Sequence, residues 1–189
     1  MGIAGKGWMG VPGIRPNGDR TFEQQFRGVG PAVSMAAGKS VLDLGCAEGL
    51  IGREFARSGA SEVVGIELLE DHLLVAAEAC KGIKNIRFIR AHLAEWALSH
   101  PDPEQYDIVL ALSIIHKIKD PAAALTWALK SCKETILLRP PIWSTGGIIG
   151  SKHSAETANV PAIMAAQGFR QGIVVDAALG EHIEYWHRA

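Results

Sequence analysis

The chain has 189 residues, of which 48% are hydrophobic and 21% are charged, and its net charge is -1. This composition is typical of one folded globular domain and argues against a disordered chain. The balanced charge provides no overall attraction to nucleic acid or to an anionic membrane, so nucleic-acid binding is not supported. No apolar run approaches the roughly 20 residues that a membrane span requires, so we expect no membrane segment.

The cysteines and the first residues predict a cytoplasmic protein. Cys46, Cys80 and Cys132 are odd in number and far apart, which indicates a reducing compartment without a disulfide framework. The opening "MGIAGKGWMG" lacks the apolar core of a secretory signal. No CxxC pair or HExxH motif occurs, so we expect no metal.

Residues 1–38 are rich in glycine and proline, and we predict that they form a leader preceding a domain at 39–189. The run "GKGWMG" fits GxGxxG by its letters, but no strand precedes it, so it reads as a flexible tail. "TFEQQFRGV" predicts a short helix with Thr21 as its N-cap and Gln24 three residues later. Trp8, Phe22 and Phe26 could form a lid over a site, or could equally belong to a helix packed on the domain.

From residue 40 the pattern alternates regularly between strands and helices. Strands are predicted at 40–45, 62–67, 85–90, 106–114, 134–139, 171–178 and 182–188. Helices are predicted at 49–59, 70–82, 92–100, 120–133 and about 161–167. The last two strands have no helix between them and should pair as a hairpin around residues 179–180. The order predicts an α/β fold, a Rossmann-like doubly wound sheet that is mostly parallel and covered on both faces.

The stretch "VLDLGCAEG" places a glycine turn between the first of these strands and a helix. In such sheets the ligand binds outside the carboxyl ends of the strands. The spacing Gly45-x-x-x-Gly49 differs from the dinucleotide fingerprint, and the carboxylates of Asp43 and Glu48 would repel phosphates. These carboxylates favour a ligand such as S-adenosylmethionine, because a carboxylate in the turn can accept a hydrogen bond from its ammonium group. At the end of the second strand Glu67 can accept both ribose hydroxyls, although a helix N-cap is a competing role.

Residues 40–187 resemble the class I S-adenosylmethionine-dependent methyltransferases. "VLDLGCAEG" resembles their first motif, "VVGIELLEDHLLVA" the second, and "YDIVLALSIIHKIKD" the fourth-strand motif. The resemblance implies a seven-stranded sheet with an antiparallel last strand, and S-adenosylmethionine lying across the ends of strands one to four. The cofactor-binding residues expected in this arrangement are Asp43, Gly45, Cys46, Ala47, Gly49, Glu67, Leu68, His92, Leu93, Ala111 and Leu112.

One position departs from that family. After the third strand its members usually carry an acid that accepts from the adenine amine, whereas "FIRAHLAEW" places His92 there. A neutral imidazole nitrogen can accept the same hydrogen bond, or backbone groups can supply it. Leu68 is apolar and suited to lie against the adenine face.

His116 follows the fourth strand, where an acceptor would meet the methyl group, and could act as a general base. The alternative is a surface histidine beside a helix. Arg139 and Trp143, after the fifth strand, are expected on the acceptor side. The resulting hypothesis is an enzyme that transfers the methyl group of S-adenosylmethionine to a small-molecule acceptor. The alternatives are a non-catalytic binding module with the same fold and, against the glycine spacing, a nicotinamide dehydrogenase. The sequence predicts neither the acceptor nor the oligomeric state.

Overall fold

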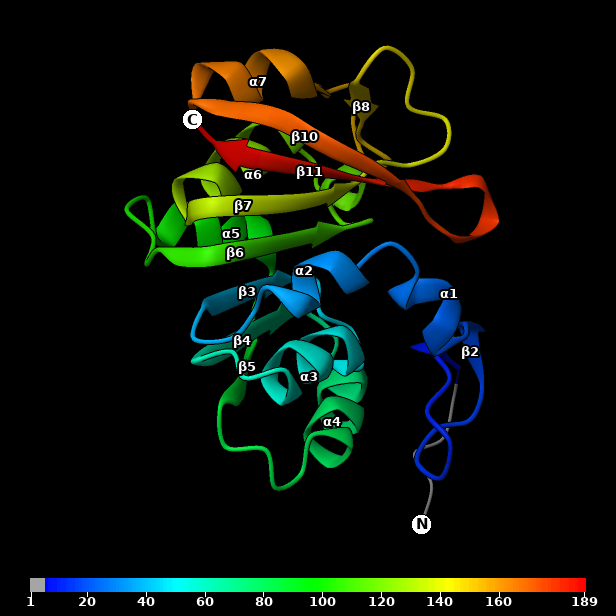
Figure 1. The fold of residues 1–189 in the computed structure, drawn as a ribbon. Helices are drawn as coiled ribbons and strands as arrows, with labels where there is room; N and C mark the ends of the chain where they lie inside the picture. The colour runs from blue at the N-terminus through cyan, green and yellow to red at the C-terminus, as the bar shows by residue number, and fades with distance from the viewer. Residues whose placement is uncertain (1–5) are drawn as a thin grey trace.

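The computed structural model describes residues 6–189 and is built around one seven-stranded sheet (Figure 1). The strand order is β10-β11-β7-β6-β3-β4-β5. The strands are β3 (Ser40–Leu44), β4 (Glu62–Glu67), β5 (Ile86–Arg90), β6 (Tyr106–Leu112), β7 (Cys132–Arg139), β10 (Phe169–Asp176) and β11 (His182–Arg188). The first five pair in parallel, while β11 runs antiparallel to both β7 and β10. The predicted fold class is therefore confirmed, including its antiparallel last strand.

Helices cover both faces of this sheet (Figure 1). One face carries α2 (Gly30–Ser34), α3 (Leu50–Arg57) and α4 (Glu70–Ala79), and the other carries α5 (Leu93–Ser99), α6 (Pro121–Lys130) and α7 (Val160–Ala166). Two apolar cores result, one on each side, because residues on a strand alternate between the faces. Leu42 and Leu44 of β3 enter the core beneath α5, α6 and α7, whereas Val41 enters the core beneath α2 and α3.

Side-chain caps begin several helices where the sequence predicts them. Thr21 caps α1 (Phe22–Phe26), and its pairing with Gln24 forms the reciprocal capping box. Asp120 caps α6 and Pro121 occupies its first turn, where the missing N–H costs nothing. These caps fix the residues at which α1 and α6 begin.

The leader is more ordered than a flexible tail, and that prediction was wrong for its described part. Residues Gly7–Met9 form β1, which pairs in parallel with β2 (Gly18–Arg20). A Cβ at Gly18 would lie 2.1 Å from the backbone nitrogen of Gly10, so the two segments approach too closely for a side chain. Gly5, the first glycine of that motif, lies outside the described residues.

The segment after β7 also contains structure that the sequence did not reveal. No strand is predicted between residues 139 and 171, but this segment includes β8 (Ile148–Gly150), which pairs with β9 (Thr157–Asn159). The single-turn 3₁₀ helix η1 (Ile115–Lys117) follows β6, and η2 (Ala178–Gly180) turns the final hairpin. Within residues 6–189, no helix has both the length and the apolar character needed to cross a bilayer.

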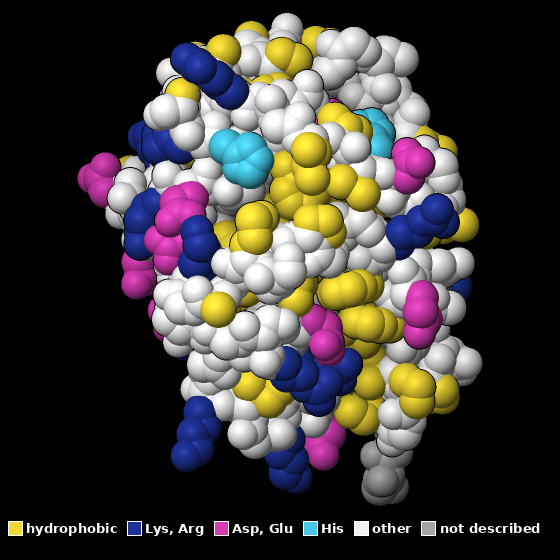
Figure 2. All heavy atoms as spheres, viewed as in Figure 1, with side chains coloured by type: hydrophobic (Ala, Val, Ile, Leu, Met, Phe, Trp, Pro, Cys, Tyr) yellow, Lys and Arg dark blue, Asp and Glu magenta, His cyan; other side chains and the backbone are white. Residues whose placement is uncertain are grey.

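On the face drawn in Figure 2, basic and acidic side chains are intermixed, and hydrophobic side chains gather in a band near the middle. The band lies over the junction of α2 with the β10–β11 ribbon and continues towards α1 (Figure 2). Phe22 and Phe26 of α1 contribute to this packing: their rings stack at 5.2 Å, and both contact the core beneath α2 and α3. The leader helix is thus attached to the domain by apolar contacts.

Candidate active site

A cavity of about 590 Å³ opens at the carboxyl ends of β3, β4, β5 and β6. This is the position where ligands bind in open α/β sheets. Its wall consists of Trp8, Gly45, Ala47, Ile66, Glu67, Leu68, Leu69, His72, Ala91, His92, Leu93, Leu112, Ser113, Ile114, Lys117, Ile118, Lys119 and His153. The lining is mostly apolar with a few polar groups, as is usual for small-molecule sites.

The turn after β3 forms one side of the cavity and has an unusual backbone. Gly45, Ala47 and Gly49 all have positive φ, at 69°, 48° and 69°. Glycine adopts this region freely, whereas alanine is strained there. The amides of Gly45 and Cys46 both donate to the Ile66 carbonyl, at 2.8 and 3.1 Å, which ties the turn to β4. Strained non-glycine residues of this kind occur preferentially at functional sites.

Glu67 ends β4 and reaches across to that turn. Its Oε2 accepts from the Ala47 amide at 3.0 Å, and its Oε1 accepts from the amides of Leu68 and Leu69 at 2.7 and 2.9 Å. His72 lies 3.8 Å from Oε2. Burial would raise the pKa of Glu67, but His72 and the amides of Leu69 and Ala47 outweigh it and lower that pKa below its ordinary value. Glu67 is therefore a fixed anion with acceptor capacity left on Oε2.

The structure brings seven of the expected cofactor-binding residues together on the cavity wall. These are Gly45, Ala47, Glu67, Leu68, His92, Leu93 and Leu112. The other four, Asp43, Cys46, Gly49 and Ala111, lie behind the wall. Leu68 is 48% exposed, although it is a large apolar residue, because it faces the cavity.

Asp43 does not converge with Glu67 on the cavity, contrary to expectation. It shares the face of β3 that carries Val41, and its carboxylate lies towards Gly52 of α3. Burial, with a further contribution from Glu67, raises its pKa to about 7, while the Gly52 backbone opposes the shift. Oδ2 finds no hydrogen-bond partner within residues 6–189. Asp43 points away from the cavity because side chains alternate along a strand, which places residue 43 beneath α3.

Two further residues of the turn face inward. A Cβ at Gly65 would lie 2.6 Å from the Cys46 sulfur, so the thiol packs into the sheet against Gly65. Burial raises the pKa of Cys46, and the acids Asp43 and Glu67 raise it further. At Gly49, a Cβ would meet the ring of Phe88 at 2.7 Å. Cys46 and Gly49 therefore support the turn from behind.

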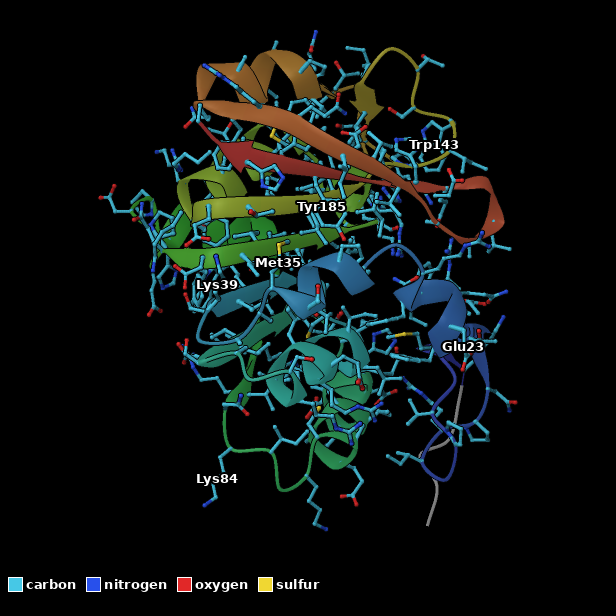
Figure 3. The ribbon with its side chains drawn as sticks, in the orientation of Figure 1. Glu23, Met35, Lys39, Lys84, Trp143 and Tyr185 are labelled. Carbon is cyan, nitrogen blue, oxygen red and sulfur yellow. The ribbon has the colours of Figure 1, made fainter. Side chains whose placement is uncertain are left out.

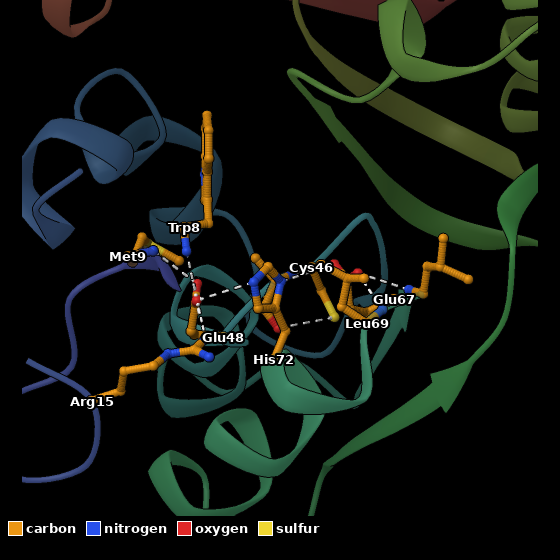
Figure 4. Close-up of polar contacts among 10 residues, drawn as sticks. Trp8, Met9, Arg15, Cys46, Glu48, Glu67, Leu69 and His72 are labelled. Atoms are coloured by element: carbon orange, nitrogen blue, oxygen red, sulfur yellow. Dashed lines mark hydrogen bonds and ion pairs between the residues drawn. The ribbon is translucent and has the colours of Figure 1, made fainter. Parts of the chain in front are cut away.

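The Glu48 carboxylate binds the leader (Figure 4). The prediction that it is available to bind the ammonium group of a ligand is therefore wrong. Its side chain is 0% exposed and accepts from the amides of Trp8 and Met9 at 2.8 and 2.9 Å. Arg15 Nη2 donates to Oε1 at 2.5 Å. A Cβ at Gly7 would lie 2.3 Å from the same carboxylate oxygen, which explains the glycine there. We call Glu48, Arg15 and the amides of residues 8 and 9 the leader clamp.

The clamp places Trp8 over the cavity, where its ring contacts cations. Lys117 Nζ lies 4.4 Å from the Trp8 ring centroid, and the Arg20 guanidinium lies 5.1 Å from it. His72 joins the clamp to the cavity, because Nε2 lies 3.7 Å from Glu48 and Nδ1 3.8 Å from Glu67 (Figure 4). Sequence reasoning assigned no binding role to His72, Ser113 and Lys117, although they lie within stretches that resemble family motifs, because the sequence does not show which side chains of a stretch face the cavity.

The acceptor-side predictions give a mixed result. His116 is buried in η1 and is absent from the cavity wall, so it is neither a rim base nor a surface histidine. Burial lowers its pKa to about 4, and Lys117 and Lys152 contribute to the shift. Its ring meets that of Trp143 edge to face at 5.1 Å. Arg139 is buried at the end of β7, next to the Ser113 amide, which donates to its carbonyl at 3.2 Å.

The sequence matches a family described as "Methyltransferase domain" over residues 36–174. The chain belongs to this methyltransferase family. A curated relative, the ubiquinone biosynthesis O-methyltransferase of Neisseria meningitidis, is 31% identical over 98 residues. That alignment covers 51% of this chain and 40% of the relative, so the similarity spans about two fifths of the relative's length.

Solved structures of methyltransferases share the fold. The magnesium protoporphyrin IX methyltransferase of Synechocystis PCC 6803 with bound SAH superimposes with a TM-score of 0.68 at 17% identity. The superposition covers 85% of this chain and 82% of that one. The N-terminal domain of EvdMO1, determined with SAH and D-fucose, gives 0.67 at 17% identity, over 95% and 88% of the two chains. At this identity the likeness establishes the common fold.

Proposed function

We propose that this methyltransferase-family chain binds S-adenosylmethionine in the cavity at the carboxyl ends of β3 to β6 and methylates a small-molecule acceptor there. The observation that carries the proposal is that Glu67 and Leu68 lie together on the cavity wall, beside a turn whose backbone has positive φ. A fixed carboxylate at the strand end disfavours a phosphate and favours hydroxyl or cationic groups. An adenosyl sulfonium fits these requirements.

The residues present fit such a cofactor. Leu68 and Leu69 present large apolar side chains to the cavity and are only half covered by protein, as a site for a flat base requires. Ser113 also lines the cavity, and its buried Oγ has no partner in the described part of the chain. A buried hydroxyl without a partner is costly, so a ligand that supplies one would gain binding energy.

We assign roles to the wall residues as follows. Glu67 Oε2 accepts from a ribose hydroxyl, while its other contacts hold the carboxylate in place. Gly45 and Ala47 let the backbone approach the amino-acid portion, because no bulky side chain stands between. Leu68, His92 and Leu93 enclose the adenine. Asp43, although behind the wall, supplies negative charge below a sulfonium when it is ionised.

S-Adenosylmethionine supplies an electrophilic methyl group when bound. The protein's contribution is to hold the acceptor in line and near contact distance, which accounts for a large share of the rate in such displacements. His116 lies off the cavity wall, and burial lowers its pKa to about 4, so it does not serve as the base. We therefore infer that the acceptor atom is already nucleophilic when it binds. Trp8, carried by a leader that spans residues 1–38, shields the site from water.

A small molecule is the acceptor class that the observations favour. The cavity is of ligand size, and the named relative acts in ubiquinone biosynthesis. Basic and acidic side chains are intermixed on the face in Figure 2, with no continuous basic stripe there for a phosphate backbone.

Titration of S-adenosylhomocysteine by calorimetry tests the proposal. We expect one site, and we expect Glu67→Ala to weaken binding by roughly 10- to 100-fold, because hydrogen bonds to a charged group contribute about 1.5–3 kcal/mol. Glu67→Gln should weaken it less, since one acceptor oxygen remains. Glu70→Gln is the matched control: Glu70 is exposed and paired with Arg90, so affinity should not change. Unchanged affinity in Glu67→Ala would remove the ribose assignment.

A non-catalytic module is the second candidate, and one observation favours it. The cavity wall does not include His116, the residue predicted to be the general base. A binding module predicts S-adenosylhomocysteine affinity without methyl transfer to any acceptor. Incubation with radiolabelled S-adenosylmethionine and a metabolite extract separates the two, because an enzyme gives a labelled small product.

A further inference from the structure

Buried polar atoms without partners gather at the carboxyl ends of β6 and β7, beside the cavity. Within residues 6–189 they are Oε1 of Gln25, Oγ of Ser113, Nδ1 of His116, and Nε and Nη1 of Arg139. Ser113 and His116 follow β6, Arg139 ends β7, and Gln25 lies on α1 above them. Native proteins leave few buried polar groups unpaired, so a cluster of this size requires an explanation.

Arg139 is the most costly member of the cluster. Its side chain is 0% exposed, and its one hydrogen bond within the described residues runs from Nη2 to the Gln25 carbonyl at 2.6 Å. Glu181 Oε2 lies 3.9 Å from Nε, too far for a hydrogen bond. Burial lowers the pKa of Arg139 to about 10, and Glu181 offsets only part of that effect. Most of its guanidinium donors therefore lack acceptors.

The local charges do not balance. Glu181 is already held by Arg20 through two hydrogen bonds of 2.7 Å each. Arg20, Arg139 and Glu181 together carry a net charge of +1 in a largely buried position. Lys117 and Lys152 also lower the pKa of His116, but both residues are exposed and their charges are solvated, so the buried excess remains +1. The group that would complete this cluster is a monoanion.

We propose that Arg139 binds a carboxylate on the methyl acceptor, so that the substrate is a small carboxylic acid. A guanidinium presents donors in a planar fork that matches a carboxylate, and a single negative charge matches the excess. Arg139 is not itself on the cavity wall, but it neighbours Ser113, which is, because the Ser113 amide donates to the Arg139 carbonyl. The inference rests on the proposed function, since it names the substrate class of the same site.

The leader covers this arginine, so α1 must move for the acceptor to reach it. The Gln25 carbonyl of α1 accepts from one N–H of Nη2, so the second N–H of Nη2 remains to form a fork for the carboxylate with Nε or Nη1, both of which are unpaired among the described residues. Trp143, half exposed and edge-on to His116, provides an aromatic surface beside this cluster. An acceptor with a ring next to its carboxylate fits both features.

Two shape-matched probe pairs test the proposal: benzoate with benzamide, and 2-naphthoate with 2-naphthamide. Affinities are measured by calorimetry at constant ionic strength, with and without S-adenosylhomocysteine. In at least one pair we expect the carboxylate to bind at least 10-fold more tightly than its uncharged amide. Arg139→Met should reduce this ratio below about twofold, and Arg139→Lys should restore part of it. Lys84→Met is the control, because Lys84 is exposed at the opposite end of the molecule from Trp143 (Figure 3).

The melting temperature distinguishes a binding role from a structural one. Arg139→Met should melt within a few degrees of the wild type or higher, because an apolar residue replaces a poorly paired buried charge and Glu181 keeps Arg20. Equal affinities within each pair, no binding of either probe, or a preference that survives in Arg139→Met overturns the proposal. So does a preference lost in Lys117→Met but kept in Arg139→Met. S-Adenosylhomocysteine affinity within twofold of wild type in Arg139→Met shows that the proposed function stands independently.

Discussion

The leader clamp predicts that one buried carboxylate, Glu48, holds the N-terminal segment over the active site. Glu48→Ala removes the acceptor for two backbone amides and leaves Arg15 buried without its partner. Both side chains of this ion pair are almost fully buried, at 3% and 0% exposure. Breaking such a pair by removing one member costs about 3–5 kcal/mol. For a domain of this size that corresponds to a drop in melting temperature of roughly 6–20 °C.

The leader can also respond by detaching, which limits the loss of global stability. Water would then satisfy Arg15 and the two amides, and the energy lost would be that of docking residues 6–20. Hydrogen exchange measured by mass spectrometry on peptides covering residues 6–20 detects this directly. In the wild type we expect the Trp8 and Met9 amides to be protected, and in Glu48→Ala we expect fast exchange there with the sheet unaffected.

Glu54→Ala provides the matched control, because Glu54 lies on α3, the helix that follows Glu48, and pairs only with Arg53 and Arg57 among the residues described. It should change neither the exchange of the leader nor the melting temperature by more than about 2 °C, as is usual for surface pairs. The double variant Glu48→Ala with Arg15→Met should lose less than the sum of the single losses, because neither charge is left alone. If Glu48→Ala kept both the leader protection and the wild-type melting temperature, the clamp would be refuted.

Two further predictions concern strain and pH. Ala47 has a φ of 48°, so Ala47→Gly should leave the melting temperature unchanged or raise it slightly. Ala47→Val should destabilise the protein by about 2 kcal/mol or more. A valine variant that melts at the wild-type temperature would show that the backbone at residue 47 is not strained. His116 has a pKa of about 4 when folded and about 6.5 when unfolded, so the stability it contributes is present above pH 6.5 and is lost as pH falls towards 4. Denaturant titrations from pH 4 to 8 should show this loss of unfolding free energy in the wild type and a flatter dependence on pH in His116→Phe. If the two proteins depended on pH identically, His116 would not be the cause of the loss.

The sequence predicts the sheet and the position of the cavity because both depend on local pattern. Apolar runs separated by capped helices give the strands, and the rule for carboxyl ends of parallel strands places a ligand beside Gly45 and Glu67. The capping box at Thr21 and the Asp120-Pro121 start of α6 are equally local, so they are recovered at the correct residues.

Tertiary contacts account for what the sequence did not predict. Glu48 and Arg15 are 33 residues apart, and nothing in "DLGCAEG" indicates that its carboxylate binds the leader. Asp43 was assigned to the ligand from its distance to the turn, but strand alternation directs it beneath α3. Arg139 was expected on the acceptor side, yet its burial and missing partners emerge only from the packing of α1 and Glu181 around it.

The most direct test of the central claim is a crystal structure of the protein with S-adenosylhomocysteine. We predict density for the ligand in the cavity, with the adenine against Leu68 and a ribose hydroxyl within hydrogen-bonding distance of Glu67 Oε2. A ligand bound elsewhere, or a cavity filled by the protein's own side chains at saturating ligand, would contradict the account.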